Sequence, residues 1–424
     1  MSIKSIFVPG DKSISHRVLI LSAIADRPTV IRNLNRGEDV GSTIKVLRGL
    51  GARIEQKRDF VLVTPRPFSK PKSVLDCGNS GTTMRLMAGL LASSQFPSEL
   101  SGDRSLLARP MERVVIPINK MGGRIQCSQD GNGPIKILPA LVPLKAIDYK
   151  IPVPSAQVKG AILLAGLGAD GKTTVTEKIA TRNHTELWLR SFGVGVEVCG
   201  LKVSLNGGVR LKSPGEVTVP GDPTAAAYLA IAALITRAGS IKIENVALNP
   251  GRIRWVEILR GMGADIDLEL IASGVEDIGN IVIHNFNKGL KPVEINAHLI
   301  PDLIDEIPAL AVLMARVEGT SIVRGAMELR VKESDRVKVI YEGFRRLGID
   351  IDMFDDGFSI KGGGNILLRG GRVNSYGDHR MAMAFGLCNL MSDRSIYING
   401  KNSVVISFPG FFRELNRPKN WIDT

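Results

Sequence analysis

The sequence is poor in the residues that most often hold metals, form disulfides or stack on nucleic-acid bases. Its 424 residues include only four cysteines and five histidines, and aromatic residues make up 5% of the chain. The cysteines stand alone, without a CxxC pair or metal-ligand spacing, which argues against a metal site and favours a reducing compartment, the cytoplasm. With so few aromatic residues, the cores must be built from Ile, Leu, Val and Ala.

Long apolar runs are also missing. The longest uncharged apolar run, residues 161–169, is far shorter than the roughly 18 residues that a membrane span needs. The first residues do not form a signal peptide, because the turn Pro9-Gly10-Asp11 follows Lys4 closely. The sequence therefore predicts neither a membrane span nor secretion.

Basic residues are in excess, with 55 Lys and Arg against 42 Asp and Glu, a formal net charge of +13. A nucleic-acid-binding protein would gather them along one face or in a run, with aromatic residues among them. Here they are dispersed, which favours a small anionic substrate held by several separated cations. Nucleic-acid binding and a merely solvated basic surface are the alternatives.

A short tag recurs at intervals of 71, 71, 70 and 85 residues. It consists of an apolar residue, Gly, two further residues and Ile or Val, and it begins at Leu50, Met121, Phe192, Met262 and Leu347. Gly after a helix and before an Ile/Val strand is the usual signal for a helix end. The spacing predicts six similar units, each reading as strand, helix, strand, helix, strand. Each unit opens with a polar turn before an apolar helix, near Asp11, Asn79, Ser155, Asp222, Asp305 and Asp378.

The most informative turn occurs twice, as Val8-Pro-Gly-Asp11 and as Val219-Pro-Gly-Asp222. A Gly-Asp turn that opens a helix leaves backbone N–H groups unpaired, which favours an anion. The first copy is followed by Lys12, Ser13 and Arg17, whereas the second has Pro223, Thr224 and Ala227 at or near those places. We therefore expect a duplicated scaffold whose working anion site lies in the first copy.

The duplication predicts two α/β domains of three units each. One domain comprises residues 11–220, and the other comprises residues 1–10 together with 221–424. The chain crosses between them near residues 10–11 and 220–222.

Further candidates for anion binding lie in loops that open helices. They are the loop 76–85 with Gly81 and Arg85, the loop 102–111 with Arg109 before Pro110, the loop 155–159 with Ser155 and Gln157, and the loop 181–186 with Arg182. Taken singly, each is also consistent with a plain turn or a helix cap. The segment 166–173 matches the P-loop pattern, but it follows a helix and precedes a strand, the reverse of a working P-loop. We interpret it as a turn.

Acidic candidates lie in the C-terminal half. Asp305 opens the apolar helix 309–315, either as its N-cap or as a general base. In the charged run 330–336, a helix would place Lys332 and Arg336 on one face with Glu333 beside them. A solvated helix start is the alternative. Arg380 precedes a further apolar run, 381–387.

Five of these motifs resemble the signatures of the 5-enolpyruvylshikimate-3-phosphate synthases, and the likeness runs from about residue 5 to 415. They are Gly10-Asp-Lys-Ser-Ile-Ser-His-Arg17, Gly78-Asn-Ser-Gly-Thr-Thr-Met-Arg85, Arg109-Pro-Met111, Arg330-Val-Lys-Glu-Ser-Asp-Arg336 and Gly377-Asp-His-Arg-Met-Ala382. The resemblance implies an α/β fold of two domains, each with three βαβαββ units (a six-fold repeated, inside-out α/β barrel), and a cleft between them. It also implies transfer of the enolpyruvyl group of phosphoenolpyruvate to the 5-hydroxyl of shikimate 3-phosphate, through a tetrahedral intermediate that loses phosphate.

The resemblance also implies residue roles. Shikimate 3-phosphate would be bound by Lys12, Ser13, Arg17, Ser155, Ala156, Gln157, Arg182, Asp305 and Lys332. Phosphoenolpyruvate would be bound by Lys12, Gly81, Arg109, Gln157, Arg336 and Arg380. The catalytic residues would be Lys12, Asp305, which takes the proton of the attacking hydroxyl, and Glu333, a candidate to exchange the methylene proton. We expect no metal or other cofactor, no nucleic-acid or membrane partner, and a monomer. The Gly81 loop has the form found in glyphosate-sensitive members.

The chain departs from the family pattern at four positions. Ile406 stands where some members have lysine, Ala156 where serine is frequent, Asn183 where aspartate is common and Glu328 where some have asparagine. The nearest rival is the sister transferase acting on UDP-N-acetylglucosamine. Against it, Ser13 follows Lys12 in place of Asn, and the loop 102–111 has no cysteine. A binder without catalytic activity is the other alternative, and it would not need Asp305 or Glu333.

Overall fold

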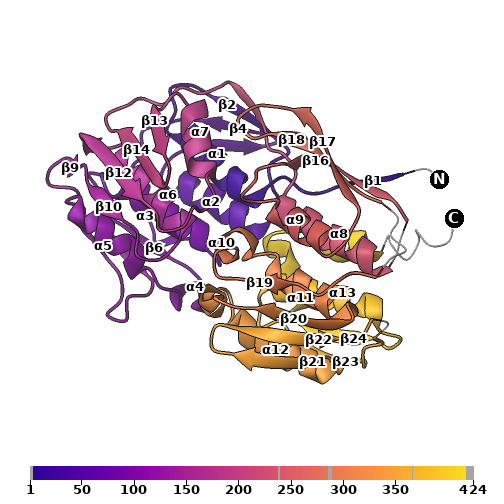
Figure 1. The fold of residues 1–424 in the computed structure, drawn as a ribbon. Helices are drawn as coiled ribbons and strands as arrows, with labels where there is room; N and C mark the ends of the chain where they lie inside the picture. The colour runs from indigo at the N-terminus through magenta and orange to yellow at the C-terminus, as the bar shows by residue number, and fades with distance from the viewer. Residues whose placement is uncertain (1–2, 237–238, 285–288, 365, 417–424) are drawn as a thin grey trace. The chain divides into compact units, whose positions relative to one another are not determined.

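The computed structural model describes residues 3–236, 239–284, 289–364 and 366–416 (Figure 1). The chain forms two compact units, Gly10–Val219 and Met1–Pro9 with Pro220–Thr424. We call them the N-terminal and the C-terminal unit. Both crossings fall one residue before the expected boundaries.

The N-terminal unit, whose residues 10–219 are all described, contains three four-stranded sheets of the same design. Their strand orders are β15-β2-β4-β3, β5-β6-β8-β7 and β10-β12-β14-β13. In each sheet the first two strands are parallel and the other neighbours are antiparallel. The strands are β2 (Thr29–Arg32), β3 (Arg53–Gln56), β4 (Phe60–Thr64), β5 (Leu75–Asp76), β6 (Ser98–Ser101), β7 (Ile125–Gln126), β8 (Ile135–Ile137), β10 (Asp148–Lys150), β12 (Lys172–Thr176), β13 (Val196–Cys199), β14 (Lys202–Asn206) and β15 (Glu216–Thr218), with β9 (Leu144–Lys145) and β11 (Ala169–Asp170) as a separate pair.

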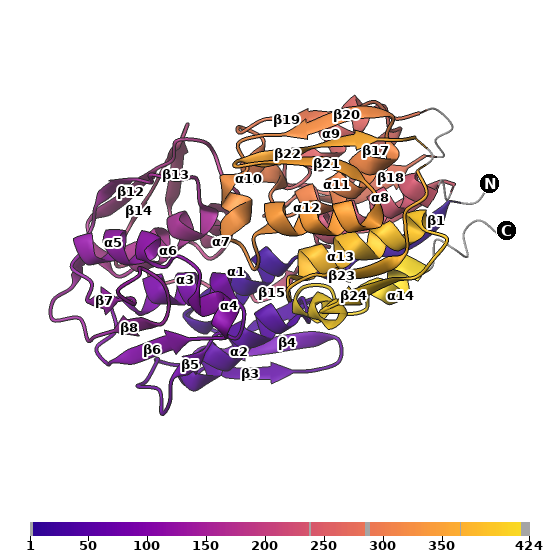
Figure 2. The same ribbon diagram turned by 90° about the horizontal axis from the view of Figure 1, so that it is seen from below.

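Helices connect these strands and fill the interior of the N-terminal unit. They are α1 (Lys12–Ala23), α2 (Glu38–Gly49), α3 (Gly81–Leu91), α4 (Arg104–Leu107), α5 (Glu112–Lys120), α6 (Ala156–Gly166) and α7 (His184–Ser191). Figure 2 shows α1, α3 and α6 side by side within the unit, and nearly all of their residues are buried. The polar turns that begin these helices are therefore held by rigid, buried elements.

The C-terminal unit repeats the design, and its last part is shorter. Its described sheets have the orders β1-β16-β18-β17, β19-β20-β22-β21 and β23-β24. The strands are β1 (Lys4–Phe7), β16 (Ile241–Ala247), β17 (Ile266–Ala272), β18 (Ile278–Ile283), β19 (Glu294–Ile295), β20 (Gly319–Val323), β21 (Asp350–Phe354), β22 (Gly357–Gly362), β23 (Gly371–Asn374) and β24 (Ile396–Asn399). The sixth sequence repeat differs after β24. Up to residue 416 it continues as the 3₁₀ helix η3 (Lys401–Ile406) and α14 (Phe411–Asn416), in place of a helix and two strands.

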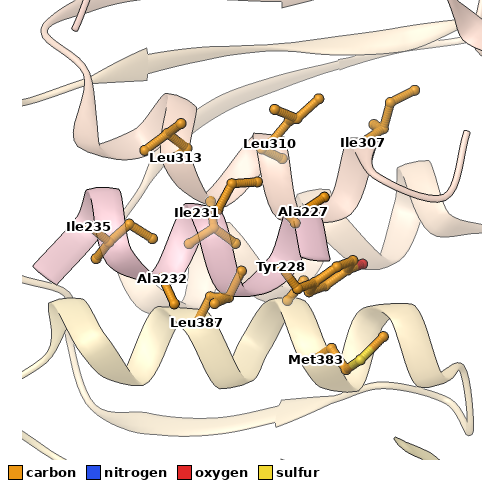
Figure 3. Close-up of a cluster of buried hydrophobic side chains, with 14 of the residues drawn as sticks. Ala227, Tyr228, Ile231, Ala232, Ile235, Ile307, Leu310, Leu313, Met383 and Leu387 are labelled. Atoms are coloured by element: carbon orange, nitrogen blue, oxygen red, sulfur yellow. The ribbon is translucent and has the colours of Figure 1, made fainter. Parts of the chain in front are cut away.

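The remaining helices of this unit are α8 (Pro223–Thr236), α9 (Arg254–Gly261), α10 (Ile300–Leu303), α11 (Ile307–Arg316), α12 (Arg336–Leu347) and α13 (His379–Cys388), with the 3₁₀ helices η1 (Met327–Val331) and η2 (Asn389–Met391). The centre of its core is α8, which is apolar on all sides. Figure 3 shows α8 between α11 and α13, with Ile231 and Tyr228 among the side chains that fill the space. A helix that is hydrophobic all round is stable only when it is surrounded in this way.

Each Val-Pro-Gly-Asp turn connects a strand of one unit to a helix of the other unit. Strand β1 precedes α1 in the chain, yet it pairs in parallel with β16 of the C-terminal unit. Strand β15 precedes α8, yet it pairs in parallel with β2 of the N-terminal unit. Each unit is thus completed by a strand from the far side of a crossing.

The repeated tags end helices as predicted. Helices α2, α5, α7, α9 and α12 stop at the tag, and its glycine has a positive φ in all five places: 100° at Gly51, 89° at Gly122, 79° at Gly193, 104° at Gly263 and 86° at Gly348. Residues other than glycine rarely adopt this conformation. The segment 166–173 runs from the end of α6 at Gly166 through β11 to Thr173 in β12, so it follows a helix and precedes a strand, as predicted. No helix among the described residues is both long and apolar enough to span a membrane.

Candidate active site

Each of the six sequence repeats opens with a helix, and five of these six helices are capped by a polar side chain. The capping residues and the amides that they accept from are Asp11 with Ile14, Ser80 with Thr83, Ser155 with Val158, Asp222 with Thr224, and Asp378 with Arg380, at 2.7, 3.2, 3.3, 2.8 and 2.8 Å. Helix α11 differs, because its N-cap is Glu306 and no side chain caps it. Asp305, just before it, is therefore not the N-cap of this helix, which leaves its carboxylate for another role.

At the start of α1, two cations are held by neighbouring elements. Lys12 Nζ lies 2.9 Å from Asp39 Oδ2, and the two side chains are 15% and 7% exposed. Arg17 Nε donates to Thr185 Oγ1 at 2.8 Å, and its Nη1 donates to the carbonyl of Ser13 at 2.9 Å. Both cations thus have a defined position near the N-terminus of α1, which favours an anion by itself.

The imidazole of His16, on the same helix, stays neutral beside these cations. Burial lowers its pKa well below the ordinary value, and Lys12 and Arg17 lower it further. Its Nδ1 lies 2.6 Å from Thr43 Oγ1, which in turn lies 2.7 Å from Thr83 Oγ1. The hydroxyl groups tie α1, α2 and α3 together behind the helix mouth.

At the start of α3, two guanidinium groups flank Gly81. A Cβ atom at Gly81 would lie 3.1 Å from Arg85 Nη1 and 3.3 Å from Arg109 Nη1, so a side chain would push against both. Arg85 contacts Gln157 Oε1, and its Nη2 donates to the carbonyl of Pro110 at 3.1 Å. Arg109 Nη2 donates to Asn79 Oδ1 at 2.5 Å. Glycine at this position keeps the backbone N–H groups accessible between two cations.

Gln157 on α6 joins this group, because its Nε2 donates to Thr82 Oγ1 at 2.9 Å. Of these residues, Arg85 had no role in the implied substrate sites. Its signal in the sequence was its place one helical turn after Gly81. The structure shows that it links Gln157 to the loop before α5.

A buried ion cluster that no pattern in the sequence indicates lies behind the start of α6. Lys159 Nζ lies 2.7 Å from carboxylate oxygens of both Glu177 and Glu186 and donates to the carbonyl of Thr181 at 3.4 Å. The Thr181 hydroxyl also contacts Glu177. Thr181 directly precedes Arg182, so this cluster fixes the segment that carries that arginine against the helix that begins at Ala156.

In the C-terminal unit, Arg336 is the centre of an ion network. Its Nε donates to Asp378 Oδ2 at 2.9 Å, its Nη2 to Glu333 Oε2 at 2.6 Å, and its Nη1 lies 3.3 Å from Asp305 Oδ1. Burial alone would lower its pKa, but Asp378, Glu333 and Asp305 raise it well above the ordinary value. The Arg336 side chain is 1% exposed and that of Asp305 is 21% exposed.

The prediction that Lys332 and Arg336 share one helical face is wrong. Residues 327–331 form η1, Lys332 is extended with ψ −153°, and α12 begins only at Arg336. The reason is Asp335, whose side chain accepts from the amide of Lys338 at 3.1 Å and starts the helix there. Burial lowers the pKa of Lys332 to about 8, opposed by Asp305 and reinforced by Arg336.

Arg380 lies at the start of α13 and is 3% exposed. Burial alone would lower its pKa, but Asp305 and other acidic groups raise it. Its guanidinium carbon lies 6.0 Å from the ring centroid of Tyr228, within cation–π range. Ile406 is a buried residue of η3.

The residues expected to bind the substrates or to act in catalysis therefore fall into two groups. The N-terminal unit carries Lys12, Ser13, Arg17, Gly81, Arg109, Ser155, Ala156, Gln157 and Arg182, and the C-terminal unit carries Asp305, Lys332, Glu333, Arg336 and Arg380. Neither group includes a cluster of three His, Cys, Asp or Glu placed to hold a metal ion, within the described residues. The N-terminal unit offers anion binding by fixed cations, and in the C-terminal unit the partly exposed carboxylate of Asp305 lies 3.3 Å from Arg336 Nη1.

Comparisons with known proteins point in one direction. A family model described as EPSP synthase (3-phosphoshikimate 1-carboxyvinyltransferase) matches residues 3–415. The chain is 43% identical to the 3-phosphoshikimate 1-carboxyvinyltransferase of a Thermotoga species over 414 residues, which cover 97% of this chain and 96% of that one. It is 41% identical to the enzyme of the same name from Bacillus subtilis over 417 residues, with the same coverage.

Solved structures agree with these matches. The EPSP synthase of Acinetobacter baumannii superposes with a TM-score of 0.85 at 40% identity, covering 98% of this chain and 95% of that one. The enolpyruvyl transferase NikO from Streptomyces tendae superposes with a TM-score of 0.79 at 17% identity, covering 98% and 94% of the two chains. The second likeness concerns the fold alone, and it confirms the expected two-domain α/β architecture.

Proposed function

The chain belongs to the EPSP synthase (3-phosphoshikimate 1-carboxyvinyltransferase) family, and on that premise we propose that it transfers the enolpyruvyl group of phosphoenolpyruvate to the 5-hydroxyl of shikimate 3-phosphate. This reaction belongs to the shikimate pathway of aromatic amino acid biosynthesis. The observation that carries the proposal is a pair of features in one chain: fixed cations around the starts of α1, α3 and α6, and a partly exposed Asp305 that does not cap its helix.

The reaction sets two requirements that these residues meet. Both substrates carry a carboxylate and a phosphate, so several guanidinium and ammonium groups must be held apart from one another and fixed. The hydroxyl must also lose its proton as its oxygen bonds to C2 of phosphoenolpyruvate, while C3 gains a proton. The tetrahedral product then loses a C3 proton and phosphate, which restores the double bond.

We propose that Lys12, Ser13, Arg17, Ser155, Ala156, Gln157, Arg182 and Lys332 bind shikimate 3-phosphate, and that Lys12, Gly81, Arg109, Gln157, Arg336 and Arg380 bind phosphoenolpyruvate. Asp305 also contacts shikimate 3-phosphate and takes the hydroxyl proton. Glu333, whose carboxylate lies 2.6 Å from Arg336 Nη2, exchanges the C3 proton. Arg85 supports this arrangement, since it contacts both Gln157 and the carbonyl before Met111.

We also propose that the enzyme acts as a cytoplasmic monomer without nucleic-acid or membrane partners and without a cofactor. The dispersed basic residues argue against a nucleic-acid partner, and the four free cysteines favour the cytoplasm.

Phosphate release tests the proposed function directly. The purified protein, treated with a chelator, should release phosphate when both substrates are present and not with either one alone. A flat phosphate assay with both substrates would overturn the proposal.

Asp305→Ala tests the proposed general base. We expect turnover to fall by roughly 10²-fold or more, the usual contribution of such a base. The protein should stay folded, because no side-chain helix cap is lost and Arg336 keeps its contacts with Asp378 and Glu333. Asp302→Ala, three residues earlier, is a matched control for loss of a carboxylate in this region. Near-normal turnover of Asp305→Ala would reject the role.

A further inference from the structure

The second Val-Pro-Gly-Asp turn precedes α8 and lacks the cations that follow the first copy. Charged side chains from elsewhere in the chain nevertheless lie at the start of α8. Asp222 accepts from the amides of Thr224 and Ala225 at 2.8 and 3.3 Å. Arg252, which is 2% exposed, donates from Nη2 to Asp222 Oδ1 at 3.2 Å and to Thr224 Oγ1 at 3.1 Å. A cation of the protein itself thus lies at this helix start.

An acid of the protein lies there too. The Thr224 hydroxyl, which accepts from Arg252, donates its proton to Glu306 Oε1. Thr224 and Glu306 are both 0% exposed. In the first copy the corresponding turn faces Lys12, Ser13 and Arg17, which we propose bind a substrate, whereas the second copy holds the carboxylate of Glu306.

Tyr228 lies one helical turn further along α8, on the same face as Thr224, and it contacts the backbone next to Glu306. Its hydroxyl lies 3.2 Å from the carbonyl oxygen of Arg380 and 3.4 Å from that of Asp305. Arg336 Nη1 donates to the carbonyl oxygen of Ile304 at 3.3 Å. Three consecutive residues, 304 to 306, are therefore each held by a separate group, and α8 provides two of the three.

Only one carboxylate of this segment is open to a reacting group. Glu306 is fully buried against α8, whereas the side chain of Asp305 is 21% exposed and lies 3.3 Å from Arg336 Nη1. Because α8 is packed between α11 and α13, as Figure 3 shows, its position relative to the start of α11 is fixed by the core. The hydrogen bond of Glu306 to Thr224 connects that rigid helix to the residue next to the base.

We infer that Thr224 and Glu306 are positioning residues that set the orientation of Asp305, so that the second helix start uses the chain's own carboxylate to place the general base. The inference rests on the proposed function. It assigns a role in turnover to the second copy of the turn, which has Pro223, Thr224 and Ala227 at or near the places of Lys12, Ser13 and Arg17.

Replacement of the Thr224 hydroxyl tests this. Thr224→Val keeps the shape of the side chain and removes the link between Arg252 and Glu306. We expect kcat to fall roughly 10- to 100-fold, the scale of a small misplacement of a reacting group, with both KM values within about twofold of wild type. Thr224→Ser restores the hydroxyl, and its kcat should stay within about threefold of wild type.

Thr236→Val is the matched control. Thr236 lies at the other end of α8, and its hydroxyl donates only to backbone carbonyls of that helix, at 2.8 Å to Ala232 and 3.4 Å to Ala233. Thermal unfolding and circular dichroism must show each variant folded at the assay temperature, and we expect this control to keep wild-type kcat.

Different results would contradict the inference and the proposed function. A folded Thr224→Val with wild-type kcat overturns the inference, and so does a Thr224→Ser as slow as Thr224→Val, which would assign the effect to packing of the methyl group. If Thr224→Val proves unfolded, the same comparison is made with Tyr228→Phe, which removes the hydroxyl contact to the Asp305 carbonyl. Wild-type protein that releases no phosphate would instead contradict the proposed function.

Discussion

Lys332 and Arg336 lie four residues apart, yet their surroundings move their pKa values in opposite directions. Burial lowers the pKa of Lys332 to about 8, from an ordinary value of 10.5. Arg336 is buried as well, but direct contacts with Asp378, Glu333 and Asp305 raise its pKa well above the ordinary value. Arg336 therefore keeps its charge far above neutral pH, whereas Lys332 loses its charge as the pH rises through about 8.

This difference predicts the alkaline limb of activity. The value of kcat/KM for shikimate 3-phosphate should fall as the pH rises through about 8, because neutral Lys332 no longer attracts the anion. Lys332→Arg should move that limb upward, since arginine stays charged. Lys338→Arg, at an exposed lysine on α12, is the control and should leave the profile unchanged. A wild-type profile that is flat up to pH about 9.5 would contradict the assignment.

The same shift has a defined consequence for stability. Between pH about 8 and 10.5 the unfolded chain binds more protons at Lys332 than the folded chain does. This residue therefore makes the free energy of unfolding increase as the pH rises through that window.

At the scale of elements, the stability of the N-terminal unit depends on the contacts between α6 and α7. The join is the ion cluster of Lys159 with Glu177 and Glu186, whose side chains are all less than 5% exposed. A buried cluster of this kind is costly to break, because one missing partner leaves charges without compensation in a medium of low polarity. The cluster also holds Thr181, next to Arg182, so the same contacts serve both the fold and the proposed substrate site.

Lys159→Met should therefore lower the free energy of unfolding by about 3–5 kcal/mol. Lys172→Met is the matched control in the same unit. Its ion pair with Glu197 has the same 2.7 Å distance, but the side chains are 48% and 68% exposed. An exposed pair contributes at most about 1 kcal/mol. Urea unfolding measures both variants, and equal losses would show that burial of the Lys159 cluster does not matter.

At the scale of the whole molecule, the net charge of +13 acts on substrates that are anions. Fixed positive charge raises the rate at which such ligands meet the protein, and salt screens it over a Debye length that falls from about 30 Å at 0.01 M to about 3 Å at 1 M. We expect kcat/KM for both substrates to fall several-fold across that range of potassium chloride, mainly through KM. Sucrose at matched osmolality controls for non-ionic effects. If kcat/KM is independent of salt, the dispersed charge is only a solvated surface.

What the sequence alone determined was local. The helix ends at Gly51, Gly122, Gly193, Gly263 and Gly348 follow from glycine's freedom to take a positive φ, which needs no knowledge of distant residues. The caps at Asp11, Ser155, Asp222 and Asp378 are equally local, since the side chain accepts from an amide two or three residues further on. The repeated turn and the family motifs, read along the chain, placed the fold and the candidate site residues.

The tertiary structure decided everything that depends on residues far apart. Lys159 meets Glu177 across 18 residues, and Thr224 meets Glu306 across 82 residues. No pattern in the sequence marks these pairs, because packing of whole helices brings them together. Lys332 was misplaced for a related reason: charge spacing allowed a helix over 332–336, but the capping side chain of Asp335 starts the helix at Arg336. Local backbone chemistry can therefore be predicted from neighbours in the chain, whereas the position and charge of a buried side chain follow from what the folded core places around it.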